Sequence, residues 1–219
     1  MAPASNPAAS NEAASSAVPT SGRAGEARAR ILQSAVRVLR ARGFEATRIS
    51  DVAQDAGVSS GLVIYHFSTR DHVLAAALRY AEEQFLDAVA SAMAQAEDPG
   101  ARLRRFLELS FHHEDGDDLP PSWVLWPAVW QQALHNPAVR EDREELDRRL
   151  RDLIAEVVRE GQEAGTFAAV DPDRFARMLS AMTDGLAIAV LLDDPTLSAD
   201  AAIQLCHRLC ADELGPGWA

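Results

Sequence analysis

Apolar residues recur at three- and four-residue steps along most of this chain, which is the spacing of helices with one buried face. The first clear stripe consists of Ile31, Leu32, Ala35, Val36, Val38 and Leu39. A longer stripe runs from Val139 to Val157. No segment gives a convincing strand pattern, so the chain is predicted to be all-α.

Turn and capping residues divide the pattern beyond residue 70 into six predicted helices. Asp98-Pro99-Gly100 and Gly165 have the chemistry that ends helices, and Asp171-Pro172 and Ser198 have the chemistry that begins them. The predicted helices span about 69–96, 101–113, 122–135, 137–164, 172–192 and 198–214. With three helices before residue 70, the pattern predicts about nine helices.

Residues Thr47 to Phe67 are predicted to form two short helices separated by a glycine turn. Thr47 is expected to cap the first helix, and Gly57 to end it in the left-handed conformation that side chains disfavour. Ser59 is expected to cap a second helix from about Ser60 to Phe67. This arrangement indicates a helix-turn-helix, whose second helix lies in the major groove of DNA.

The same segment resembles the DNA-binding domain of the TetR family of bacterial repressors. The resemblance rests on Gly43-Phe44, Thr47, Val52-Ala53, Ala56-Gly57-Val58-Ser59, Gly61, His66-Phe67, Arg70, Leu74 and Leu78, and covers about residues 25–85. One position departs from the family, because the aromatic residue common two places before the His is here Ile64. The run from Leu62 to Phe67 is more similar to the branch that contains the choline-responsive repressor of betaine synthesis.

The resemblance implies a three-helix helix-turn-helix domain over 25–85, with its motif at 48–67, followed by a helical ligand-binding and dimerisation domain over 86–219. It implies a repressor that binds a palindromic operator as a homodimer, through helices 172–192 and 198–214, and that a small molecule releases. The alternative is a protein of this fold that binds a ligand or a protein partner but no longer binds DNA. Neither reading requires a cofactor or a catalytic activity.

Charge is distributed unevenly along the chain. Residues 1–70 carry a net charge of +3 and the remainder −15, giving −12 overall, and every basic side chain is an arginine. A domain that grips phosphates needs positive charge where the DNA lies. The asymmetry therefore favours a DNA-binding end joined to an acidic body.

Candidate DNA contacts lie on the second helix of the motif and beside it. The residues expected to contact DNA are Thr47, Arg48, Ser59, Ser60, Gly61, Leu62, Val63, Tyr65, His66 and Arg70. Thr47, Arg48, His66 and Arg70 are expected at phosphates and the others near the groove, although Leu62 or Val63 must also serve the core. Because that helix has no Arg, Asn or Gln, specificity is expected from hydroxyls, thymine methyl contacts, backbone approach and DNA shape.

Three tryptophans, Trp123, Trp126 and Trp130, are spaced on one helical face. One interpretation is core packing, as large aromatic residues commonly provide. The other is a ligand cavity formed with Phe111, Met182 and Asp184, where Trp faces and nearby acids favour a cation such as a quaternary ammonium or a polyamine. Pro127 is expected to kink this helix, and the acidic loop 114–118 is a further possible source of acids.

Other features are consistent with a regulator and exclude several classes. The pair His112-His113 could share a metal only with loop acids, and Cys206 and Cys210 could form a redox or soft-metal pair. No phosphate-binding glycine loop or recognised nucleophile is present, so an enzyme is rejected and no metal is expected. Residues 1–22 are expected to be a disordered tail without signal-peptide character. A cytoplasmic, nucleoid-associated protein is expected.

Overall fold

The computed structural model describes residues 21–111 and 122–218, with side chains from residue 24 and residue 125 onward in the two ranges. Within these ranges it consists of nine α-helices and one 3-10 helix, and contains no strand. The helices are α1 (Ser21–Ala46), α2 (Ile49–Ala56), α3 (Ser60–Phe67), α4 (Arg70–Ala94), α5 (Pro99–Phe111), α6 (Ser122–His135), α7 (Pro137–Glu163), α8 (Pro172–Leu191) and α9 (Ala199–Leu214), followed by η1 (Pro216–Trp218). The all-α prediction is confirmed.

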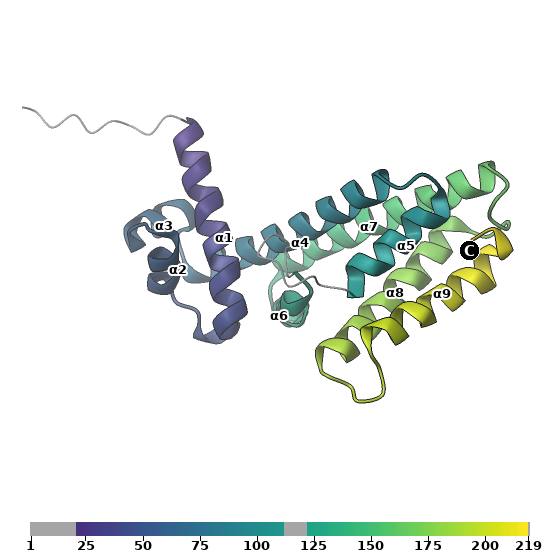
Figure 1. Cartoon of the computed structure of the whole chain (residues 1–219). Coiled ribbons are helices and arrows are strands. Elements are labelled where there is room, and N and C mark those ends of the chain that lie inside the picture. The colour runs from purple at the N-terminus through teal and green to yellow at the C-terminus, as the bar shows by residue number, and fades with distance from the viewer. Residues whose placement is uncertain (1–20, 112–121, 219) are drawn as a thin grey trace, which may run out of the picture.

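The helices form a small head and a larger body. Helices α1, α2 and α3 gather at one end, α4 runs from them into the body, and α5, α7, α8 and α9 lie along the other end (Figure 1). One hydrophobic cluster forms the core of the head and also includes Leu125 and Val129 of α6. A second fills the body around Phe106, Ile154 and Phe175. Helix α4 contributes to both, so it connects the two cores mechanically.

Local capping signals placed most helix ends correctly. The Ser59 hydroxyl accepts a hydrogen bond from the Leu62 N–H at 3.2 Å. The carboxylate of Asp171 caps α8, and Ser198 caps α9 through the Ala201 N–H. Gly57 ends α2 with φ at 64°, as predicted. These side chains satisfy the N–H groups that the first turn of a helix leaves without partners.

The predicted N-cap role of Thr47 is wrong. Helix α2 is capped by Arg48, whose backbone N–H donates to the Asp51 carboxylate at 3.1 Å. Thr47 is fully buried, and its hydroxyl donates back to the Gly43 carbonyl at 2.7 Å. The reason lies in α1, where Gly43 has non-helical angles of φ 76° and ψ 169° and leaves its carbonyl in need of a donor.

Several sequence expectations fall outside the described residues. These are the tail up to residue 20, His112, His113, the acidic loop 114–118 and the side chain of Trp123. Ser21 and Gly22, expected in the tail, already belong to α1. Across the described ranges, no helix combines the length and the apolar character that crossing a membrane requires.

Candidate functional site

Helix α3 has one buried face and one free face. Val63 and Phe67 lie four residues apart and are buried in the core of the head. Ser60, Gly61 and Tyr65 are exposed, Tyr65 with 74% of its surface accessible. An exposed recognition helix that begins with small residues lets the backbone approach DNA bases closely.

The structure assigns two neighbouring residues of α3 differently from the sequence analysis. Val63, expected near the groove, is 0% exposed, so its side chain belongs to the core. Ile64, which was not proposed as a contact, is 48% exposed on the free face. Leu62 is half-buried and packs against the core cluster of the head. The four-residue spacing of Val63 and Phe67 could have identified Val63 as core, and it places Ile64 about 100° around the helix from Val63, at the margin of the free face.

Arg70 points into the protein. Its guanidinium donates to the carbonyl oxygens of Phe44, Glu45 and Thr47, and to the carboxylate of Asp71. It also lies over the Phe44 ring, with Cζ 5.3 Å from the ring centroid. Since all three guanidinium nitrogens have partners, the structure gives Arg70 a role in holding the turn between α1 and α2, whereas the sequence analysis assigned it a phosphate contact.

Arg48 lies at the start of α2 and His66 on α3. The Arg48 side chain is exposed, and its backbone N–H is held by Asp51, which also pairs with Arg42 at 3.0 Å. His66 is half-buried, with its ring 5.2 Å from that of Tyr65.

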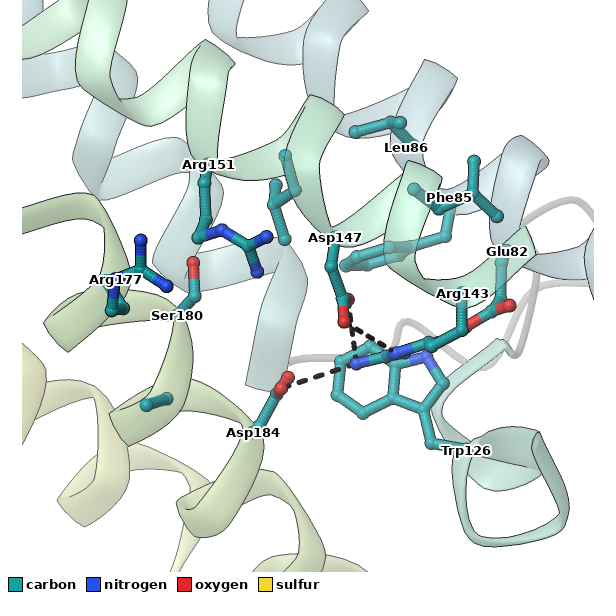
Figure 2. A pocket seen from close by; sticks show the side chains of 13 residues that line it. Glu82, Phe85, Leu86, Trp126, Arg143, Asp147, Arg151, Arg177, Ser180 and Asp184 are labelled. Carbon is teal, nitrogen blue, oxygen red and sulfur yellow. Dashed lines mark hydrogen bonds and ion pairs between the residues drawn. The ribbon is translucent and has the colours of Figure 1, made fainter. Parts of the chain in front are cut away.

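A cavity of about 150 Å³ lies in the body where α4, α6, α7 and α8 meet (Figure 2). Phe85, Leu86 and Leu150 provide apolar lining, and Trp126 meets Phe85 edge to face, with ring centroids 5.7 Å apart. The lining also includes six charged residues, three acids and three arginines. An aromatic wall beside several converging charges is the composition of a small-molecule site.

Arg143 of α7 sits at the acidic end of this cavity. Its guanidinium donates to Glu82 of α4 at 2.8 Å, to Asp147 at 2.9 and 3.0 Å, and to Asp184 of α8 at 3.4 Å. Its Cζ also lies 5.7 Å from the ring centroid of Trp130 in α6. A single side chain therefore ties together four helices around the cavity.

Burial raises the pKa of the acids at this end. The pKa of Asp184 is raised to about 6 by burial, which the nearby Arg143 and Arg151 only partly offset. Burial likewise raises the pKa of Glu82 and of Asp147 against the opposing effect of Arg143. Carboxylates whose pKa burial has raised gain from a second cation, because it compensates charge that water no longer solvates.

The residues predicted to bind the ligand separate into two groups. Trp126 and Asp184 line the cavity. Trp130 does not line it but packs against the guanidinium of Arg143, which does. Phe111 is buried in the body core, and Met182 packs against that core without lining the cavity. Sequence reasoning missed Glu82, Arg143 and Asp147, since charges four residues apart on a helix resemble an exposed face.

The cysteine pair does not show reactive character. Cys206 and Cys210 are free thiols with no exposed surface. Burial raises the pKa of Cys206 to about 11 and that of Cys210 to about 12. The thiolate is the reactive form of cysteine, so both side chains act here as small apolar residues of the core.

A helix-turn-helix head joined to a helical body with a charged, tryptophan-walled cavity defines a ligand-responsive, DNA-binding transcriptional regulator. The family model described as bacterial regulatory proteins, tetR family, matches residues 31–77, and the one described as BetI-type transcriptional repressor, C-terminal, matches residues 99–215. The chain belongs to the TetR family and carries a C-terminal domain of the BetI type.

Relatives of known sequence or structure agree with this assignment. The HTH-type transcriptional regulator BetI of Burkholderia mallei is 30% identical over 191 residues, which are 86% of this chain and 94% of the relative. A putative transcriptional regulator from Saccharomonospora viridis, solved in complex with choline, is 33% identical with a TM-score of 0.77, covering 87% of this chain and 98% of its own. A TetR regulator from Haloarcula marismortui is 26% identical with a TM-score of 0.75, over 87% and 99% of the two chains.

Proposed function

We propose that this regulator represses transcription by binding a palindromic operator as a homodimer, and that a small cationic effector in the body cavity releases it. The observation that carries the effector class is the meeting of Trp126 with three carboxylates, from Glu82, Asp147 and Asp184, around one cavity. Aromatic faces and carboxylates both attract quaternary ammonium groups. The choline complex of the Saccharomonospora viridis relative supports the same ligand class.

Operator recognition is assigned to the free face of α3. Ser60, Gly61, Ile64 and Tyr65 are exposed there and would face the base edges, with Ser59 and Leu62 at its margins. Ile64 and the Tyr65 ring suit contacts to thymine methyl groups. Arg48 and His66 would bind phosphates beside the groove, and the buried hydroxyl of Thr47 and the guanidinium of Arg70 would hold α2 and α3 in place.

Dimer formation is assigned to α8 and α9, which lie side by side at the end of the body (Figure 1). Leu205 on α9 remains 39% exposed, and Met178, Met182 and Leu186 on α8 are only partly buried. Apolar residues at this density favour a second copy, and a two-fold dimer presents two reading heads to a palindrome. Residues 25–85 would then form the reading domain and 86–219 the effector and dimer domain, acting at the nucleoid in the cytoplasm.

Release is proposed to pass through α4, since this helix carries Arg70 at the head and Glu82 at the cavity. Arg79 fixes α4 to α7 through Asp142 and Glu145, one turn from Glu82. Suppose that the effector binds tenfold more tightly to the state with wrongly spaced heads than to the operator-binding state. Each occupied site then favours the non-binding state by about 1.4 kcal/mol. Two sites would weaken operator binding roughly a hundredfold.

Genome-fragment selection with the purified full-length protein tests this proposal. The expected result is enrichment of a palindrome, whose affinity falls steeply with salt and falls again when choline is added. Arg48→Ala should weaken binding and lower the salt slope by about one phosphate contact, while Trp126→Ala should remove the response to choline. Enrichment of no sequence, with and without choline, would contradict the regulator and favour a protein of this fold that has lost DNA binding.

A further inference from the structure

The cavity has two ends of opposite charge, and both belong to the site of the proposed effector. At one end, Glu82, Asp147 and Asp184 contribute three carboxylates around the single guanidinium of Arg143. When all three are ionised, this end keeps a surplus of negative charge. Asp184 is the least satisfied of the three, since its contact with Arg143 is the longest, at 3.4 Å.

Two other arginines form the opposite end. Arg151 of α7 and Arg177 of α8 line the cavity, and their guanidinium groups lie on either side of Ser180 (Figure 2). In the part of the chain that the structure describes, neither arginine makes a hydrogen bond or a close ion pair. Arg151 attracts Asp147 and Asp184 only at longer range, and Arg177 is exposed. Two guanidinium groups that share a cavity repel one another, and an anion between them would remove that repulsion.

Ser180 adds a neutral donor at the same place. Its Oγ is buried, and among the described residues it has no hydrogen-bond partner. A buried hydroxyl without a partner costs free energy, so such groups in native proteins usually have a function or an additional partner. Beside Arg151 and Arg177, the partner that fits this hydroxyl is an acceptor on an anionic ligand.

The spacing of the two ends fits one small molecule. Asp147 and Arg151 are one helical turn apart on α7, about 6 Å along the axis, and Asp184 and Arg177 are about 10 Å apart along α8. Side chains converging from both helices shorten these spans. A cavity of about 150 Å³ is smaller than the sites of drug-sized ligands, which excludes a long acyl chain inside it.

We propose that the effector is a small zwitterion. Its alkylammonium group lies against Trp126 beside Asp147 and Asp184, and its carboxylate is bound by Arg151 and Arg177 with a hydrogen bond from Ser180. This inference rests on the cationic effector proposed above and adds the anionic half of the ligand. A plain cation such as choline would bring no negative charge to the two arginines, because it ends in a neutral hydroxyl.

Titration calorimetry on the intact protein separates the two possibilities. The probes are choline, trimethylglycine, in which a carboxylate replaces the hydroxymethyl group, and 4-trimethylammoniobutanoate, in which three methylenes separate the charges. Hydrogen bonds to charged groups imply that at least one zwitterion binds tenfold or more tightly than choline. The Arg151→Gln, Arg177→Gln double variant should lose that advantage, measured as the ratio of zwitterion affinity to choline affinity in the same variant, and Ser180→Ala should lose part of it.

Arg148→Gln is the matched control, because Arg148 is an exposed arginine of α7 that pairs with Asp152 away from the cavity. It should leave all three affinities unchanged. If choline binds as tightly as both zwitterions and the double variant does not change the ratio, the zwitterion is excluded and the cationic effector stands. If none of the three ligands binds, both proposals are overturned. Circular dichroism of each variant shows whether a loss of binding reflects a loss of folding.

Discussion

Asp184 is the titrating group at the acidic end of the cavity, with its pKa raised to about 6 by burial. The charged groups that face it are Arg143, Asp147 and Arg151, all on α7. Glu82 of α4 reaches the same cluster through Arg143. Near neutral pH Asp184 is mostly ionised, and mild acid removes its charge while exposed carboxylates stay ionised.

Choline affinity should therefore fall in mild acid. Choline carries a permanent charge, so a pH effect on its binding belongs to the protein. At pH 5, about one unit below the pKa of Asp184, only about a tenth of this group is ionised, and affinity should be up to tenfold weaker than at pH 7.5. Calorimetry at the two pH values measures this. Asp184→Asn should weaken binding at pH 7.5 and flatten the pH dependence, whereas Asp152→Asn, at an exposed site, should do neither.

Arg70→Ala should damage the head without removing a phosphate contact. The substitution leaves carbonyl groups at Phe44, Glu45 and Thr47 without their donor, which should lower the stability of the head by about 1–3 kcal/mol. Thermal unfolding and salt-dependent operator binding measure the two effects. Weaker binding with an unchanged salt slope and a lower melting temperature is expected. A reduced slope with unchanged stability would instead make Arg70 a phosphate contact.

At the scale of elements, the end of α7 is fixed by a glycine. Gly161 is buried, and its carbonyl accepts hydrogen bonds from the N–H groups of Thr166 and Phe167 at 2.9 and 3.0 Å. A Cβ added at Gly161 would lie 2.1 Å from Cδ2 of the Phe167 ring. The ring packs directly on this helix backbone, so a side chain at residue 161 would have to displace Phe167 where the chain turns toward α8.

Gly161→Ala is accordingly expected to destabilise the protein, although alanine favours helices. Displacing Phe167 should cost about 1–3 kcal/mol, more than the gain of up to about 1 kcal/mol in helix propensity. Chemical denaturation measures the difference. Gly25→Ala in α1 is the control, since an added Cβ there meets nothing within 4 Å, and it should be neutral or slightly stabilising. Equal stability of the two variants would show that the ring moves aside freely.

Helix positions could be predicted from the sequence because their signals are local. Asp171, Ser198 and Gly57 act on residues within one turn, and they fixed the ends of their helices correctly. Within α3 the sequence was less informative, since Leu62, Val63 and Ile64 are consecutive apolar residues on a helix of 8 residues. So short a run has no clear period, and the core of α1, α2 and α4 decides which side chain is buried.

The cavity was predictable only in part, for a different reason. Trp126 and Asp184 were recognisable from their residue types, whereas Arg143 and Asp147 have the four-residue spacing of an ordinary exposed ion pair. Their burial arises from the packing of α4, α6 and α8 around α7, which joins residues about 60 positions apart, such as Glu82 and Arg143. Contacts of that range leave no periodic signal in the sequence.

For the whole molecule, the exposed apolar residues of α8 and α9 predict the oligomeric state. Leu205→Glu places a charge on the proposed interface and should convert the dimer to a monomer at micromolar concentration. Sedimentation velocity measures the mass, and operator binding should be lost with the dimer. Asp152→Lys, on the exposed side of α7, should leave the dimer intact. A variant Leu205→Glu that stays dimeric would exclude this face as the interface.

In the release mechanism proposed above, the length of α4 sets the scale of the movement that effector binding would produce. Glu82 lies 12 residues from Arg70, about 18 Å along the axis of a helix of 25 residues. A tilt of about 5° about the cavity would carry the head about 1.5 Å sideways, and two-fold symmetry would double the change in separation between the heads. Half-sites on DNA repeat every 34 Å or so, and hydrogen bonds to bases tolerate only tenths of an ångström. A ligand of a few atoms that tilts α4 slightly at the cavity would thus displace the recognition helix far enough to disturb its fit in the major groove.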